Sequence, residues 1–167
     1  FVKDNLSDTI QAFKSALDKS DVLLVSGGIS VGDYDFAKTA FEEIGVKEVF
    51  YKVNQKPGKP LYFGMYHSKP VFGLPGNPAS ALMCLYEYVL PAIRLLSGKN
   101  DSEPTKMFLP LEEGFIKKGI RPVFVKAFAS SKGVLILAGQ ASSMLHTFAV
   151  ANALAFIPSN VSDLKKG

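Results

Sequence analysis

Apolar and polar positions follow one rhythm up to about residue 98 and another after it. In the first part, short apolar runs at 21–26, 48–53 and 70–74 predict buried strands. Apolar residues recur at helical spacing over 6–17, 36–44 and 78–96, with Pro91 expected to kink the last helix and Gly98 to end it. Strands that alternate with helices in this way predict an α/β domain, built as a three-layer α/β/α sandwich over residues 1–98.

After the polar stretch 97–104, the pattern changes to short strands separated by turns. The strands are predicted at 107–111, 121–129, 134–138 and 153–157, with one short helix over 142–150. No helix–strand alternation continues here. We therefore predict a second domain over 105–167, a small all-β domain of the barrel or sandwich type.

The loop after the first strand carries the densest chemistry of the chain. Its residues are Gly27, Gly28, Ile29, Ser30, Val31, Gly32, Asp33, Tyr34 and Asp35. Open α/β sheets bind ligands at the carboxyl ends of their strands, where glycines let backbone N–H groups approach an anion. Asp33 and Asp35 supply oxygen ligands of the kind that Mg²⁺ accepts. The loop therefore predicts a site for a phosphorylated ligand with a metal.

Other interpretations of this loop remain open. Residues 28–32 fit the G-x-S-x-G pattern of a serine hydrolase, but Gly32, Asp33 and Tyr34 intervene before the next helix, which disfavours a nucleophile elbow. Neither a dinucleotide fingerprint nor a P-loop lysine is present. A purely structural turn, with Asp35 capping the helix, would leave the doubled glycine unexplained.

Two further loops follow predicted strands of the same sheet. One carries Lys52, Lys56 and Lys59, and its prolines and glycine restrict where the lysines point. These lysines are expected to bind anionic oxygens, although a solvated turn is the simpler alternative. The other loop is Pro75-Gly76-Asn77-Pro78, where Asn77 suits a helix N-cap and Pro78 the first helical position.

These three loops together resemble the signature loops of the molybdopterin molybdenumtransferases, the MoeA and gephyrin E-domain family. The resembling stretches are 27–35, 56–60 and 73–78, in that order, and 140–145 with 151–154 resemble the small C-terminal β-domain of the family. The resemblance implies a molybdopterin-binding α/β domain that lacks its first strand, so the chain is expected to be a C-terminal fragment.

The resemblance also implies a reaction and roles for individual residues. Molybdate is inserted into adenylylated molybdopterin and AMP is released, with Mg²⁺ bound by Asp35 and Asp33. Asp4, Asp35, Lys52 and Lys56 are the implied catalytic residues. The implied substrate-binding residues are Gly27, Gly28, Ser30, Gly32, Lys59, Pro75, Gly76, Asn77 and Ser142. Helix capping is the structural alternative for both Asp4 and Ser142.

Composition narrows the function classes. Of the 167 residues, 47% are hydrophobic, and the net charge of +4 comes without the dense basic tracts of a nucleic-acid binder. We expect no membrane-spanning run, and a buried, unreactive thiol at Cys84, the single cysteine. Nothing suggests a disulfide scaffold, which fits a cytoplasmic protein. The family resemblance implies a homodimer that works with a molybdopterin adenylyltransferase and molybdoenzymes. A non-catalytic, gephyrin-like scaffold module is the alternative.

Overall fold

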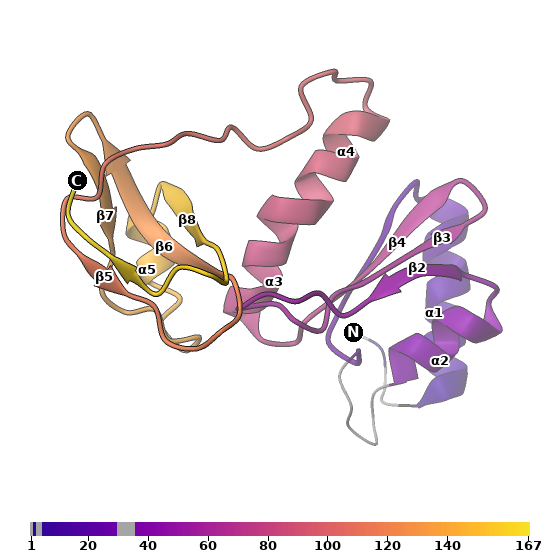
Figure 1. The fold of residues 1–167 in the computed structure, drawn as a ribbon. Helices are drawn as coiled ribbons and strands as arrows, with labels where there is room; N and C mark the ends of the chain where they lie inside the picture. Colours follow the sequence, from indigo (N-terminus) through magenta and orange to yellow (C-terminus); the bar gives the residue numbers. More distant parts are fainter. Residues whose placement is uncertain (1, 3–4, 30–35) are drawn as a thin grey trace. The chain divides into compact units, whose positions relative to one another are not determined.

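The first unit of the chain is built on a four-stranded mixed sheet (Figure 1). A computed structural model describes residues 2, 5–29 and 36–167, which cluster into two units, 1–53 with 58–103 and 54–57 with 104–167. The sheet has the order β1 (Leu23–Ser26), β4 (Lys69–Leu74), β3 (Tyr62–Tyr66), β2 (Lys47–Tyr51). β1 and β4 pair in parallel, whereas β3 is antiparallel to both of its neighbours. β1, β4 and β2 therefore run in one direction and end at the same edge of the sheet.

Two helices, α1 (Leu6–Lys19) and α2 (Phe36–Glu43), pack on one face of this sheet. Phe13 of α1 stacks on Phe41 of α2 at 4.9 Å between ring centroids, and Phe41 stacks on Tyr62 of β3 at 4.7 Å. All three rings are at most 5% exposed. This aromatic column joins both helices to the sheet, and stacked aromatic pairs stabilise beyond the area that they bury.

The long helix after β4 lies on the other side of the sheet and consists of three parts (Figure 1). They are α3 (Pro78–Cys84), a π-helical turn η1 (Leu85–Val89) and α4 (Leu90–Leu96). Pro91 lies in the first turn of α4, directly after the π turn. A π turn interrupts the regular hydrogen-bond ladder, so the helix can accept a proline that has no backbone N–H to donate. Gly98 follows with φ 75°, as the predicted helix end requires.

The expectation that no apolar run reaches membrane-spanning length is wrong for this helix. Pro78–Leu96 is long and apolar enough by length and composition alone, with a mean hydropathy of 1.4, and 28% of it is buried. Helices inside globular proteins meet the same criterion, so this feature carries no argument for a membrane.

The second unit is sheet-rich. β6 (Val123–Ser130) lies between β7 (Gly133–Ile136) and β8 (Ala153–Ile157) in an antiparallel sheet. β5 (Phe115–Ile116) pairs with β9 (Asp163–Leu164), and α5 (Thr147–Val150) is one helical turn. Its core contains Val123, Val125 and Ile157.

The structure corrects two predicted elements of this unit. The strand predicted at 107–111 is absent from the described chain, where only Leu111 forms a single bridge to Val134. Met107 and Phe108 are 69% and 104% exposed, because no neighbouring strand pairs with them. The helix predicted over 142–150 is confined to its last four residues, and the residues before it form turns.

Candidate functional site

The loop after β1 begins with two glycines in the left-handed region. Gly27 and Gly28 have φ values of 86° and 67°, which L side chains rarely adopt. The Gly27 amide donates to the Leu74 carbonyl at 3.1 Å, and the Gly28 carbonyl accepts from the Ala37 amide at 3.1 Å. The loop is thus attached to the neighbouring strand at one end and to the start of α2 at the other. The predicted site residues Ser30, Gly32, Asp33 and Asp35 lie outside the described residues.

The loop after β4 lies directly against this glycine pair. A Cβ atom built on Gly76 would be 3.5 Å from the Cα atom of Gly27. Pro75, before it, is buried. The side-chain oxygen of Asn77 accepts from the amides of Ala79 and Ser80 at 3.1 and 3.3 Å, so the predicted N-cap is confirmed. The carboxyl ends of the two parallel strands therefore bring their loops into contact.

The lysine loop after β2 starts with an unusual backbone conformation. Lys52 has φ 68°, in the left-handed region that disfavours residues other than glycine. Its amide donates to the Leu61 carbonyl at 2.9 Å, and the Val53 amide donates to the Lys59 carbonyl at 2.9 Å. Lys52 and Lys59 are both exposed. These bonds close the loop at its base and leave its lysines at the surface.

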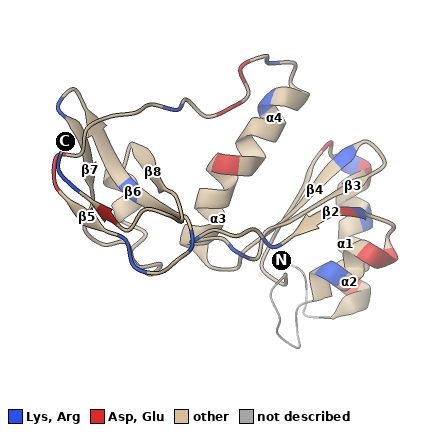
Figure 2. Cartoon of the chain, in the orientation of Figure 1, with Lys and Arg blue, Asp and Glu red and all other residues tan. Residues whose placement is uncertain are grey.

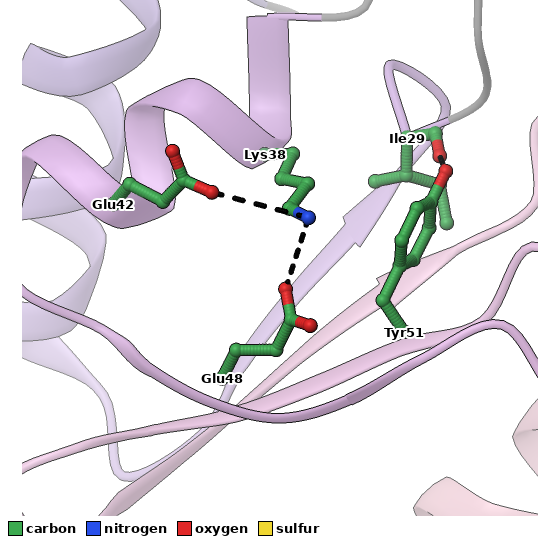
Figure 3. Close-up of polar contacts among 5 residues, drawn as sticks. All are labelled: Ile29, Lys38, Glu42, Glu48 and Tyr51. Atoms are coloured by element: carbon green, nitrogen blue, oxygen red, sulfur yellow. Dashed lines mark hydrogen bonds and ion pairs between the residues drawn. The ribbon is translucent and has the colours of Figure 1, made fainter.

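A tyrosine joins this loop to the glycine loop. The hydroxyl of Tyr51, the last residue of β2, donates to the Ile29 carbonyl at 2.6 Å (Figure 3). Ile29 follows the glycine pair and is 2% exposed. The loops after β1, β2 and β4 are therefore connected at one edge of the sheet, although β1 and β2 are not adjacent strands.

Lys56 belongs to the second unit, unlike the other two lysines of the predicted cluster. Its amide donates to the Pro122 carbonyl at 3.0 Å, and its carbonyl accepts from the Phe124 amide at 2.8 Å. Lys56 thereby forms a parallel bridge with Val123 at the start of β6. Its side chain is exposed.

The predicted residue Ser142 lies in a turn that is fixed to the same strand. The side chain of Gln140 accepts from the Lys126 amide at 2.9 Å, and it donates to the Lys126 and Leu137 carbonyls at 2.8 and 2.7 Å. On one edge of β6, the backbone of Phe124 therefore pairs with Lys56, and the backbone of Lys126 pairs with the Gln140 side chain. These positions are about 7 Å apart along the strand. The second unit therefore places Lys56 and the turn with Ser142 next to one another.

The Lys126 side chain is buried and forms hydrogen bonds to this turn. It is 4% exposed, and its ammonium group donates to the Met144 and Ala141 carbonyls at 3.1 and 3.5 Å. The same group lies 5.2 Å from the centroid of the Phe148 ring. Burial lowers the pKa of Lys126 because the charged form loses hydration.

The starts of α1 and α5 bear on the capping alternatives for Asp4 and Ser142. The N-cap of α1 is Asn5, whose side-chain oxygen accepts from the Asp8 amide at 2.8 Å, whereas Asp4 lies outside the described residues. Ser142 caps no helix, because α5 begins at Thr147 after His146. The capping explanation for Ser142 is therefore wrong.

Cys84 is fully buried in α3, as predicted. Burial raises the pKa of its thiol to about 12, so it stays protonated and unreactive at neutral pH.

The described part of the chain holds no group of three His, Cys, Asp or Glu side chains that could bind a metal. Lys and Arg positions are spread along both units of the described chain without forming a dense tract (Figure 2). The site residues in the described part thus favour a small anionic ligand over a nucleic acid.

Comparison with known proteins assigns both parts of the chain. Residues 1–95 match the family described as "Probable molybdopterin binding domain", and residues 109–167 match the "MoeA C-terminal region (domain IV)". The molybdenum cofactor synthesis protein cinnamon of Drosophila melanogaster is 35% identical over 95% of this chain. The molybdopterin molybdenumtransferase of Staphylococcus epidermidis is 31% identical over 98% of it.

A solved structure agrees with these relatives. The molybdopterin biosynthesis MoeA protein from Pyrococcus horikoshii superposes with a TM-score of 0.77 and 26% identity, over 99% of this chain and 40% of that protein. The chain spans 28% of the length of the fly relative and 40% of the length of the staphylococcal relative.

Proposed function

Because the chain belongs to the MoeA family of molybdopterin-binding proteins, we propose that it carries the catalytic part of a molybdopterin molybdenumtransferase. The reaction inserts molybdate into adenylylated molybdopterin and releases AMP. The observation that carries this proposal is the connection of three polar loops, after β1, β2 and β4, at one edge of the sheet. Such an edge is where open α/β sheets bind phosphorylated ligands.

The glycine loop and its neighbour form the proposed phosphate-binding part. Gly27 and Gly28 have no Cβ atoms, so backbone N–H groups can approach a phosphate closely. Gly76 lies against them, and α3 begins one residue after Asn77 with its positive end near the loop. Pyrophosphate cleavage develops negative charge on oxygen, and fixed backbone dipoles stabilise that charge without reorganising.

The lysines form the proposed oxyanion-binding part. Lys52 and Lys59 are exposed on a loop that is closed at its base, and their ammonium groups act as point charges for molybdate or the pterin phosphate. In the second unit, Lys56 and Ser142 are proposed to bind anionic groups of the pterin substrate or molybdate, with Gln140 and Lys126 holding the turn that carries Ser142.

A magnesium ion is proposed to be held by Asp35 and Asp33, with Asp4 as a further acidic group. Hard carboxylate oxygens suit Mg²⁺, which would neutralise the pyrophosphate when bound. We also propose that the protein acts as a homodimer beside a molybdopterin adenylyltransferase and molybdoenzymes, as the family resemblance implies, and that it does so in the cytoplasm, which its single cysteine fits.

The decisive experiment measures AMP release from adenylylated molybdopterin with and without molybdate. We expect release that depends on both molybdate and Mg²⁺. Asp35→Asn should raise the Mg²⁺ concentration needed for half-maximal rate, because it removes a ligand charge. Asp18→Asn, on the exposed side of α1, is the matched control.

Binding of the pterin without molybdate-dependent release would refute the enzymatic proposal and favour the scaffold alternative. An unchanged Mg²⁺ dependence in Asp35→Asn would refute the metal assignment alone.

A further inference from the structure

Tyr51 contacts two parts of the proposed site at once, although it was not among the predicted site residues. It ends β2, and its hydroxyl reaches across to the Ile29 carbonyl at 2.6 Å. Figure 3 shows the ring extending from its strand to the segment that follows the glycine pair. A donor–acceptor distance of this length is typical of a well-formed hydroxyl hydrogen bond.

This bond completes the attachment of the glycine segment. The Gly28 carbonyl already accepts from Ala37 of α2, and the Ile29 carbonyl accepts from Tyr51. Two successive carbonyls are therefore held by partners outside the loop. Since a peptide group is planar, holding its carbonyl also fixes the direction of its N–H group. The Ile29 side chain adds an apolar anchor against Gly73, where a Cβ atom would be only 2.8 Å from it.

The ring of Tyr51 makes a second set of contacts. The ammonium group of Lys52 lies 4.7 Å from the ring centroid, and that of Lys38 lies 4.9 Å from it. Lys38 also pairs with Glu48 at 3.2 Å and with Glu42 at 3.9 Å, so its charge is balanced by carboxylates (Figure 3). Contacts of an ammonium group with an aromatic face are attractive and restrict the long side chain. The ring therefore limits where Lys52 can point.

We propose that Tyr51 is the positioning residue of this site, which holds the glycine segment through its hydroxyl and Lys52 through its ring. One rigid side chain would then keep the phosphate-binding loop and an oxyanion-binding lysine at a fixed separation. The inference rests on the proposed function for the identity of the two ligands. The contacts themselves are independent of that identity.

The two halves of the proposal can be separated by two substitutions. Tyr51→Phe removes the bond to Ile29 and keeps the ring under Lys52, whereas Tyr51→Leu removes both. Tyr66→Phe is the matched control, because Tyr66 ends β3 at the opposite edge of the sheet, where it pairs with Lys69. Leu at position 51 can destabilise the core, so the decisive variant is Tyr51→Phe.

The first measurement is hydrogen exchange of the backbone over residues 27–29 in the protein without substrate. We expect Tyr51→Phe to accelerate exchange there about fivefold, the effect of losing one hydrogen bond of ordinary strength. Tyr66→Phe should leave this segment unchanged. Unaltered exchange in Tyr51→Phe would overturn the proposal, whether or not the protein has the proposed activity.

The second measurement uses the AMP-release assay. In Tyr51→Phe, the KM for adenylylated molybdopterin should rise about fivefold while the half-maximal molybdate concentration stays unchanged. In Tyr51→Leu, both should rise. Faster exchange without any change in KM would give the hydrogen bond between Tyr51 and Ile29 a structural role only and overturn the positioning claim. Absence of AMP release in the unmodified protein would instead refute the proposed function. The exchange measurement would then still test whether Tyr51 holds the glycine segment.

Discussion

The strongest prediction on stability concerns Gln140, whose amide takes the place of a strand residue on the edge of β6. The change is Gln140→Leu, which keeps a side chain of similar size but removes every polar atom. Three hydrogen bonds are lost, one from the Lys126 amide and two to the Lys126 and Leu137 carbonyls. The turn that carries Ser142 is then no longer fixed to the sheet.

The magnitude follows from the groups left behind. The Lys126 carbonyl still accepts from the Leu137 amide at 3.0 Å, so only the Lys126 amide loses its partner within a residue that is 4% exposed. A buried, unpaired N–H group costs about 1–3 kcal/mol, and the partly buried leucine recovers less than about 1 kcal/mol. We therefore expect the free energy of unfolding to fall by about 2 kcal/mol. For a unit the size of 54–57 with 104–167, this corresponds to a drop of roughly 8–16 °C in its midpoint.

Calorimetry resolves this change because the chain has two units that need not unfold together. Only the transition of the second unit should move in Gln140→Leu. Gln11→Leu, at an exposed position of α1, is the control that removes a glutamine without buried bonds. A shift below about 2 °C, or one equal to that of the control, would refute the reasoning, since the three Gln140 hydrogen bonds would then contribute no more than a surface group.

Three further predictions concern other parts of the chain. Lys56→Ala should raise the molybdate concentration for half-maximal AMP release about tenfold without lowering the melting temperature, because alanine keeps both backbone bonds to the start of β6 and only an exposed ammonium group is lost; a collapse of the melting temperature would make this lysine structural. Tyr62→Phe should raise the free energy of unfolding by about 1 kcal/mol in urea titrations, since the Tyr62 hydroxyl is buried with no hydrogen-bond partner among the described residues; a loss of stability would contradict this. Cys84→Ala should flatten the alkaline loss of stability. Burial raises the pKa of this thiol from 9.0 to about 12, so between these values the unfolded chain loses a proton that the folded chain keeps, and stability falls by up to about 1.4 kcal/mol per pH unit. Burial also raises the pKa of the Tyr62 hydroxyl to about 12, so this group lowers stability in the same way above pH 10. An unchanged slope between pH 9 and 10 in Cys84→Ala would refute the assignment.

Local sequence signals predicted much of the first unit correctly. The apolar runs at 21–26, 48–53 and 70–74 correspond to β1, β2 and β4 to within two residues at each end. Asn77 and Pro78 begin α3 as expected, because capping depends only on a few neighbouring amides. These features are local in the chain, so the residues that cause them are also the residues that show them.

The strand β3 is not visible in the local sequence pattern. Tyr62–Tyr66 lies between two prolines in the lysine loop and a tight turn at His67, which has φ 52°. Its strand character depends on pairing with β2 and β4 on both sides. The opposite error occurred at 107–111, where suitable residues have no pairing strand and remain extended and exposed.

Two buried lysines were equally invisible. Lys126 lies under the Ser142 turn, and Lys117 donates to the carbonyls of Gly119, Arg121 and Ser159 at 2.9 to 3.3 Å. Lysine is almost never fully buried unless its charge is satisfied. The satisfying carbonyls come from residues up to 42 positions away, so no local pattern reveals them.

The sequence by itself determined β1, β2 and β4 with the polar loops that follow them, the Asn77 cap of α3 and the family resemblance, because each depends on residues that are neighbours in the chain. Tertiary structure alone decided which loops meet. It joined the loops after β1 and β2 through Tyr51, and it assigned Lys56 to the second unit beside the turn of Ser142. The physical reason is that hydrogen bonds between distant segments form only when packing brings their donors and acceptors together, and the chain order carries no direct sign of that packing.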